Sequence, residues 1–163
     1  MDIKFENIIK EYHPILFKIG RLYSSDYDYE DLYQEMLINI WKGFENFKGD
    51  SKLSTWVYRV ALNTALTFKR NNSKHNNNEK WVHHFDIPDN SSNKEKEETE
   101  RKEVRLYEAI YKLKPDQKAI ILLYLDKKSY NEISEIIGLS ESNIGVKINR
   151  IKKELFNVLS QSL

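Results

Sequence analysis

The chain has 163 residues, enough for one ordinary domain or two small ones, and its 40% hydrophobic content can form packed cores. It has no cysteine, which excludes disulfides and thiolate metal sites, and no apolar run long enough to span a bilayer. Because the first residues also have no signal-peptide core, the sequence predicts a cytoplasmic protein.

The net charge is only +1, so the chain as a whole does not indicate a polyanionic partner. Residues 1–70 carry ten basic and ten acidic side chains, and residues 71–103 carry six and eight. Residues 104–163 carry ten and seven, which places the modest basic excess in the last third of the chain. This distribution predicts weak nonspecific DNA affinity for the protein by itself.

Helical patterns fill the first 70 residues. Apolar residues from Phe5 to Ile19 recur at helical spacing and indicate a helix or a helix pair, kinked or restarted at Pro14. A second helix is expected over residues 28–45, with Asp28 as its N-cap. A third is expected over residues 51–71.

The second predicted helix has two unlike faces. Its expected core positions are Tyr33, Met36, Leu37, Ile40 and Phe44. Its opposite face carries Asp31, Gln34, Glu35, Ile38 and Lys42. An isoleucine among acidic and amide groups is unusual for a solvated surface, although single exposed aliphatic residues are common. A partner-binding face and an ordinary surface therefore both remain open.

The third predicted helix also has a mixed outward face. Its buried side is expected to contain Val57, Val60, Ala61, Thr64, Ala65 and Phe68. Its other side is expected to contain Trp56, Arg59, Leu62, Asn63, Leu66, Lys69 and Arg70. Basic and amide groups beside an aromatic ring suit single-stranded or distorted nucleic acid, because rings stack on bases while cations hold phosphates. The alternative is that Trp56 is an ordinary core residue.

Residues 71–94 have the composition of a flexible linker. Residues 71–93 contain seven asparagines, three serines and one proline. The linker divides an all-α chain into two small helical domains, residues 1–70 and 95–163. His83, His84 and Asp86 suggest a metal site, but they lie in this linker and no second such cluster accompanies them. No catalytic residues are nominated, and neither an enzyme nor a cofactor is expected.

The C-terminal domain is predicted to end in a helix-turn-helix. A helix ending at Leu113 and another over residues 115–125 precede it. Within residues 130–155, Gly138 supplies the turn and Ser140 is a suitable N-cap for the second helix. That helix turns small polar and basic residues outward, as reading of the DNA major groove requires. The alternative is an ordinary helical hairpin with a solvated face.

Two segments together resemble a known family. Residues 31–70 contain the blocks DLYQE and TWVYRVALN, and the segment from Ala109 to about Leu159 contains LKPDQKAIILLYL and the helix-turn-helix. In this order and spacing they resemble the bacterial RNA polymerase sigma factors of the extracytoplasmic-function (ECF) type, in the sigma-70 family. Conserved region 2 of the family corresponds to the first segment and region 4 to the second.

The resemblance implies partners and roles. Core RNA polymerase is bound through the clamp helices of its largest subunit and the flap of its second-largest subunit, and promoter DNA is bound at its −10 and −35 elements. Many members also bind an anti-sigma factor, and no small-molecule substrate is expected. The resemblance implies docking on the clamp helices by Asp31, Gln34, Glu35 and Ile38. It implies −10 contacts by Lys48, Lys52, Trp56, Arg59, Asn63 and Arg70. It implies −35 contacts by Ser142, Asn143, Val146, Lys147, Asn149 and Arg150.

A rival hypothesis is a one-component helix-turn-helix regulator whose N-terminal domain senses a ligand or dimerises. It explains the C-terminal half of the chain equally well. It leaves the Trp56, Arg59 and Asn63 surface, beside an acidic helix face, without an explanation.

Overall fold

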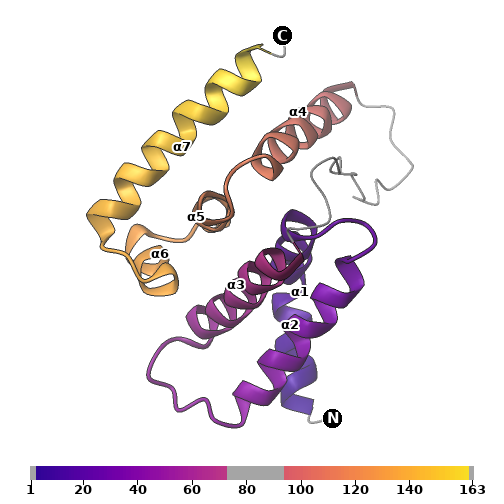
Figure 1. The fold of residues 1–163 in the computed structure, drawn as a ribbon, viewed down its shortest axis with the longest axis vertical. Coiled ribbons are helices and arrows are strands. Elements are labelled where there is room, and N and C mark those ends of the chain that lie inside the picture. Colours follow the sequence, from indigo (N-terminus) through magenta and orange to yellow (C-terminus); the bar gives the residue numbers. More distant parts are fainter. Residues whose placement is uncertain (1–2, 73–93, 162–163) are drawn as a thin grey trace.

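The protein is all-helical wherever its structure is described. The computed structural model describes residues 3–72 and 94–161, and every regular element within them is an α-helix (Figure 1). The helices are α1 (Ile3–Tyr23), α2 (Tyr29–Phe44), α3 (Leu53–Asn72), α4 (Lys94–Tyr111), α5 (Pro115–Leu125), α6 (Tyr130–Ile137) and α7 (Glu141–Gln161). The expected all-α class is confirmed. Most of the predicted linker, with His83, His84 and Asp86, lies outside the described residues.

Helix α1 runs without interruption past Pro14, so the predicted alternative of a restart at this residue is wrong. A proline inside a helix costs about 3 kcal/mol because it removes a hydrogen bond and crowds the preceding turn. The residues that follow it offset that cost, since Leu16, Ile19 and Leu22 are almost fully buried in the core. Tertiary packing therefore keeps the helix continuous.

Helices α1, α2 and α3 pack together as an N-terminal bundle (Figure 1). Helix α2 contributes Leu32, Met36 and Ile40, all fully buried. The sequence pattern predicted the last two but missed Leu32. Across this core the Asn39 side-chain amide donates to Thr64 Oγ1 at 3.0 Å, which fixes α2 and α3 in register.

Helices α4 to α7 form a C-terminal bundle around α5. Helix α5 begins with Pro115, whose fixed φ suits a first helical position, and residues 118–123 of this helix are buried throughout. Because these residues are buried on every side of the helix, the central part of α5 has no solvent-exposed polar face. The remaining helices turn apolar stripes toward it, including Ile133 of α6 and Ile144, Ile148 and Ile151 of α7.

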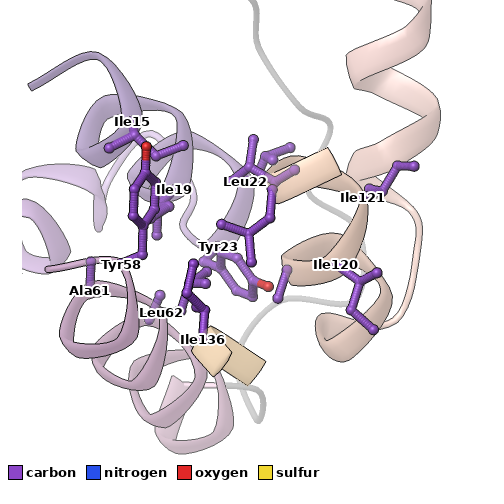
Figure 2. Packing of buried hydrophobic residues seen from close by; sticks show 14 of the residues in the cluster. Ile15, Ile19, Leu22, Tyr23, Tyr58, Ala61, Leu62, Ile120, Ile121 and Ile136 are labelled. Atoms are coloured by element: carbon purple, nitrogen blue, oxygen red, sulfur yellow. The ribbon is translucent and has the colours of Figure 1, made fainter. Parts of the chain in front are cut away.

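The two bundles also pack against each other, through α3 with α6 and α1 with α4, and share one hydrophobic core (Figure 2). Tyr23 donates its hydroxyl hydrogen to the Pro115 carbonyl oxygen at 2.5 Å. Leu62, expected on the outward side of the third helix, is only 2% exposed. That expectation was wrong because the C-terminal bundle covers this side of α3.

A buried lysine lies at this junction. Lys118 of α5 is 3% exposed, and its ammonium group donates to the Leu22 carbonyl oxygen at 3.0 Å. The same nitrogen lies 4.6 Å from the ring centroid of Tyr111 and 5.6 Å from that of Tyr23. Burial first, and then the positive charge of Lys69, lower the pKa of Lys118 to about 8.

This lowered pKa predicts a pH-dependent stability. Between pH 8 and 10.5 the unfolded chain keeps a proton on Lys118 that the folded protein loses, so folding becomes more favourable as the pH rises. The slope is at most about 1.4 kcal/mol per pH unit. Urea unfolding of the wild type and Lys118→Met from pH 7.5 to 9.5 measures this slope. The wild type should gain stability relative to the variant across this range, and a constant difference would contradict the assignment.

Candidate nucleic-acid interface

The outward face of α2 is open to solvent, as the sequence predicts. Asp31, Gln34, Glu35 and Ile38 are all exposed, because the opposite face of the helix is anchored in the core. Ile38 is 45% exposed within this acidic surface. The structure therefore brings these four residues together on one face of the N-terminal bundle.

Trp41 extends this face, although it was not among the predicted docking residues. It lies three residues after Ile38 on α2, and half of its surface (51%) is exposed. Residues three apart are neighbours on a helix surface, so the two side chains form an apolar pair beside the carboxylates. The three-residue spacing from Ile38 to Trp41 is the sequence pattern from which Trp41 could have been predicted.

The bend between α2 and α3 forms one wall of a pocket of about 860 Å³. Its lining residues are Asn46, Phe47, Lys48, Gly49, Asp50, Ser51, Lys52, Trp56, Arg59 and Glu135. The rings of Phe47 and Trp56 lie 5.3 Å apart between centroids, and a side chain at Gly43 would collide with Trp56. Four of the predicted −10 residues therefore share one pocket: Lys48, Lys52, Trp56 and Arg59.

The structure also places α6 at this pocket, which the sequence pattern did not indicate. One guanidinium nitrogen of Arg59 donates to the Glu135 carbonyl oxygen at 2.6 Å. The Lys52 ammonium lies 3.9 Å from a carboxylate oxygen of Glu132. The other two predicted −10 residues, Asn63 and Arg70, are exposed further along α3 and do not line the pocket.

The helix-turn-helix is confirmed as α6, a turn and α7. Ser129 and Glu132 form a capping box at the start of α6, and this hydrogen bonding lowers the pKa of the Glu132 carboxyl. Gly138 ends α6 in the left-handed conformation, with φ at +85°. Ser140 then caps α7 by accepting the Asn143 backbone N–H at 3.2 Å.

The outward face of α7 contains the predicted −35 residues. Ser142, Asn143, Val146, Asn149 and Arg150 are exposed, and Val146 is 48% exposed. Lys147 is half-buried, and its ammonium lies 3.8 Å from an Asp116 carboxylate oxygen. The structure thus brings all six to one helix, with Lys147 paired to α5.

Among residues 3–72 and 94–161, no helix combines the length and apolar character needed to cross a membrane. Histidine, aspartate and glutamate side chains within residues 3–72 and 94–161 form no group of three or more able to hold a metal ion.

Comparison with family models covers both bundles. Residues 8–75 match Sigma-70 region 2, and residues 103–155 match Sigma-70 region 4. These are the α1–α3 bundle and most of the α4–α7 bundle, in the family's order. The chain belongs to the sigma-70 family, in its ECF type.

This chain is similar to named sigma factors from several bacteria. The ECF RNA polymerase sigma factor SigG of Mycobacterium tuberculosis is 30% identical over 85% of the chain, which spans only 44% of SigG. The ECF RNA polymerase sigma-E factor of Haemophilus influenzae is 26% identical over 94% of the chain and 86% of its own length. The RNA polymerase sigma factor YlaC of Bacillus subtilis is 29% identical over 82% of the chain and 78% of its own length.

Two solved structures share the fold of this family member. The sigma factor RpoE of Bartonella quintana, in complex with the anti-sigma factor NepR, has a TM-score of 0.73 and 19% identity, over 96% of this chain and 97% of that one. CnrH, in complex with the cytosolic domain of CnrY, has a TM-score of 0.69 and 17% identity, over 98% of this chain and 89% of that one.

Alanine substitutions at the two glycines of the helix-turn-helix should have opposite effects on the stability of the protein. Gly138→Ala should destabilise the protein by about 1 kcal/mol, because the left-handed conformation is unfavourable for a residue with a Cβ. Gly145→Ala should stabilise α7 by about 0.5 kcal/mol, because alanine favours the helix. The new Cβ would lie 3.3 Å from the ring of Tyr130, which is 38% exposed and free to shift outward.

Urea unfolding of both variants measures these changes. Equal destabilisation by the two substitutions would show that the Tyr130 ring is fixed against α7, contrary to this prediction.

Proposed function

We propose that this chain binds core RNA polymerase and directs it to promoters as a sigma factor. The observation that carries the proposal is the presence of three surfaces in one sigma-70 family chain: an acidic helix face, an aromatic and basic pocket, and a helix-turn-helix. The resembling proteins SigG, sigma-E and YlaC are named as RNA polymerase sigma factors. A protein with this proposed role acts in the bacterial cytoplasm, where polymerase and DNA are found.

The exposed face of α2 is the proposed docking site for the clamp helices of the largest polymerase subunit. Asp31 and Glu35 supply negative charge, and Gln34 supplies an amide that donates and accepts hydrogen bonds. Ile38 and Trp41 supply exposed apolar area next to these polar groups, and tryptophan is enriched among residues that dominate binding energy. Apolar area with polar and charged neighbours is the usual composition of a specific protein interface.

The pocket and the outer surface of α3 are the proposed −10 site. Lys48, Lys52, Arg59 and Arg70 offer cations to the phosphates of an opened strand. The adjacent rings of Trp56 and Phe47 offer stacking partners for unpaired bases. The exposed amide of Asn63 offers both a donor and an acceptor to a base edge.

The outward face of α7 is the proposed −35 site. Ser142, Asn143 and Asn149 bring polar groups to base edges or phosphates, while Lys147 and Arg150 bring positive charge. Val146 suits contact with a thymine methyl group. The same bundle is proposed to contact the flap of the second-largest subunit, which would supply much of the affinity that the low net charge of the chain does not.

An anti-sigma factor is a further proposed partner. The two solved structures compared above are both complexes, one of them with a protein named as an anti-sigma factor. A protein that covers the faces of α2 or α3 would compete directly with polymerase or promoter DNA for the same residues.

Transcription in vitro tests the proposed function. Core polymerase of the source bacterium should initiate at specific start sites on genomic promoter fragments only when this chain is added. No specific initiation would contradict the proposal. Tight, specific duplex binding without polymerase would instead support the one-component regulator.

Charge reversal on α2 should prevent docking on polymerase. Glu35→Lys places a positive charge in the centre of an acidic face, and we expect core binding to weaken at least about a hundredfold without unfolding. Glu6→Lys is the matched control, because it makes the same charge change at an exposed position on α1. Pull-down of core polymerase measures the effect, and undiminished binding by Glu35→Lys would refute the docking assignment.

Loss of the α3 contacts should impair promoter opening but not assembly with core. We expect Trp56→Ala and Asn63→Ala to lower opening about tenfold or more, since base stacking and base-edge contacts are lost. Asn7→Ala, at an exposed asparagine of α1, is the control for Asn63→Ala. Permanganate footprinting of unpaired thymines measures opening. Normal footprints for both site variants would be inconsistent with the −10 assignment.

A further inference from the structure

An acidic side chain of α5 lies at the edge of the proposed −35 face. A carboxylate oxygen of Asp116 lies 3.8 Å from the Lys147 ammonium. Lys147 lies four residues after Asn143 and three before Arg150, so these three residues of α7 are neighbours on the helix surface. Asn143 and Arg150 are both exposed. A carboxylate therefore stands beside residues assigned to DNA, whose phosphates carry the same sign of charge.

The position of this carboxylate is set by the way α5 begins. Asp116 follows Pro115 in the first turn of the helix. The next residue, Gln117, donates its side-chain amide to a Glu154 carboxylate oxygen at 3.1 Å. Lys147 and Glu154 are seven residues apart, about two helical turns, so they lie on one side of α7. The first turn of α5 thus contacts that side of α7 at two points, which keeps Asp116 next to Lys147.

The pair is exposed enough to exchange partners. The side chain of Lys147 is 41% exposed and that of Asp116 is 63% exposed. An ion pair in such surroundings is weak, so an approaching phosphate can displace the carboxylate. Arg150 forms no ion pair within residues 3–72 and 94–161. The two cations of the −35 face therefore differ in how readily they meet DNA.

We propose that Asp116 is a specificity-determining residue of the −35 face, which holds Lys147 away from the phosphates of unselected DNA. Phosphate contacts carry no direct sequence information, so withholding this cation lowers affinity for all sequences alike. At the −35 element, base contacts by the neighbours of Lys147 seat α7 in the groove, and Lys147 exchanges the carboxylate for DNA. The inference rests on the proposed function, because it takes α7 as the helix that reads duplex DNA.

The salt dependence of binding measures how many phosphates the protein contacts. Fluorescence anisotropy of the full-length protein with a random-sequence duplex gives the slope of log K against log salt, which changes by about 0.9 for each contact. Asp116→Asn should steepen this slope by about 0.9, because Lys147 is released to a phosphate. Its affinity at low salt should rise about threefold, in line with the loss of one exposed ion pair.

A second substitution tests whether Lys147 is the released cation. Lys147→Gln by itself should leave the slope on random duplex unchanged, but in the Asp116→Asn background it should remove the added contact. Asp116→Glu should restore wild-type binding, since it keeps a carboxylate at this position. Glu141→Gln is the matched control, because it makes the same charge change at the exposed start of α7, where the carboxylate accepts the Asn131 amide at 2.9 Å. Its effect should not depend on Lys147.

A promoter duplex tests specificity. A duplex with the −35 region of a promoter found in the transcription experiment is compared with the random duplex. Asp116→Asn should strengthen binding to the random duplex more than binding to the promoter duplex, so the ratio of the two affinities falls. Lys147→Gln should weaken binding to the promoter duplex alone. Circular dichroism and thermal unfolding confirm that each variant is folded.

Arg150→Gln distinguishes failure of this inference from failure of the proposed function. It should flatten the slope on either duplex. If neither Arg150→Gln nor any other variant changes duplex binding, the −35 assignment of α7 is overturned. If Arg150→Gln weakens binding but the effects of Asp116→Asn and Lys147→Gln simply add, only the role of Asp116 is overturned. A coupled response on random duplex without transcription by core would overturn the sigma role and support Asp116 as a residue that controls DNA binding.

Discussion

Helix α3 is packed on two sides, and the positions of the other helices follow from this constraint. One side places Val57, Ala61 and Ala65 in complete burial against α1 and α2. These small and branched residues allow close helix approach, so the bend before α3 and its pocket are held at the edge of the N-terminal bundle. The adjacent side buries Leu62 under the C-terminal bundle. On α3, only the strip that includes Asn63 and Arg70 remains exposed. The DNA-binding role proposed for α3 therefore depends on how the neighbouring helices cover its other residues.

The junction between the bundles contains many polar groups for a buried surface. Tyr23, Tyr58 and Lys118 each donate a hydrogen bond across it, so burial leaves none of these three groups unsatisfied. Burial is nevertheless unfavourable for the Lys118 charge, as its lowered pKa shows. An interface of this composition resembles those between domains that move relative to one another. The proposed role, in which the two bundles contact separated promoter elements, requires a junction that holds in solution and still separates.

Local sequence signals predicted most of the secondary structure. The turn at Gly138, the cap at Ser140 and the start of α5 at Pro115 follow from side chains within a few residues of each feature. Helical spacing likewise predicted that α7 turns small polar and basic residues outward. The prediction failed where distant residues decided the outcome. Pro14 does not divide α1, because the helix is held by the core on both sides of it, and Leu62 is buried by a bundle that no periodicity in α3 indicates.

By itself, the sequence determined an all-helical chain with a helix-turn-helix, an acidic face on α2 and an aromatic and basic surface on α3, because helix periodicity and capping are local properties. Only the tertiary structure placed Glu132 and Glu135 against Lys52 and Arg59. These contacts join residues more than 70 positions apart. They depend on how two independently patterned bundles meet, which is set by the shape and polarity of both surfaces at once rather than by the pattern along either helix.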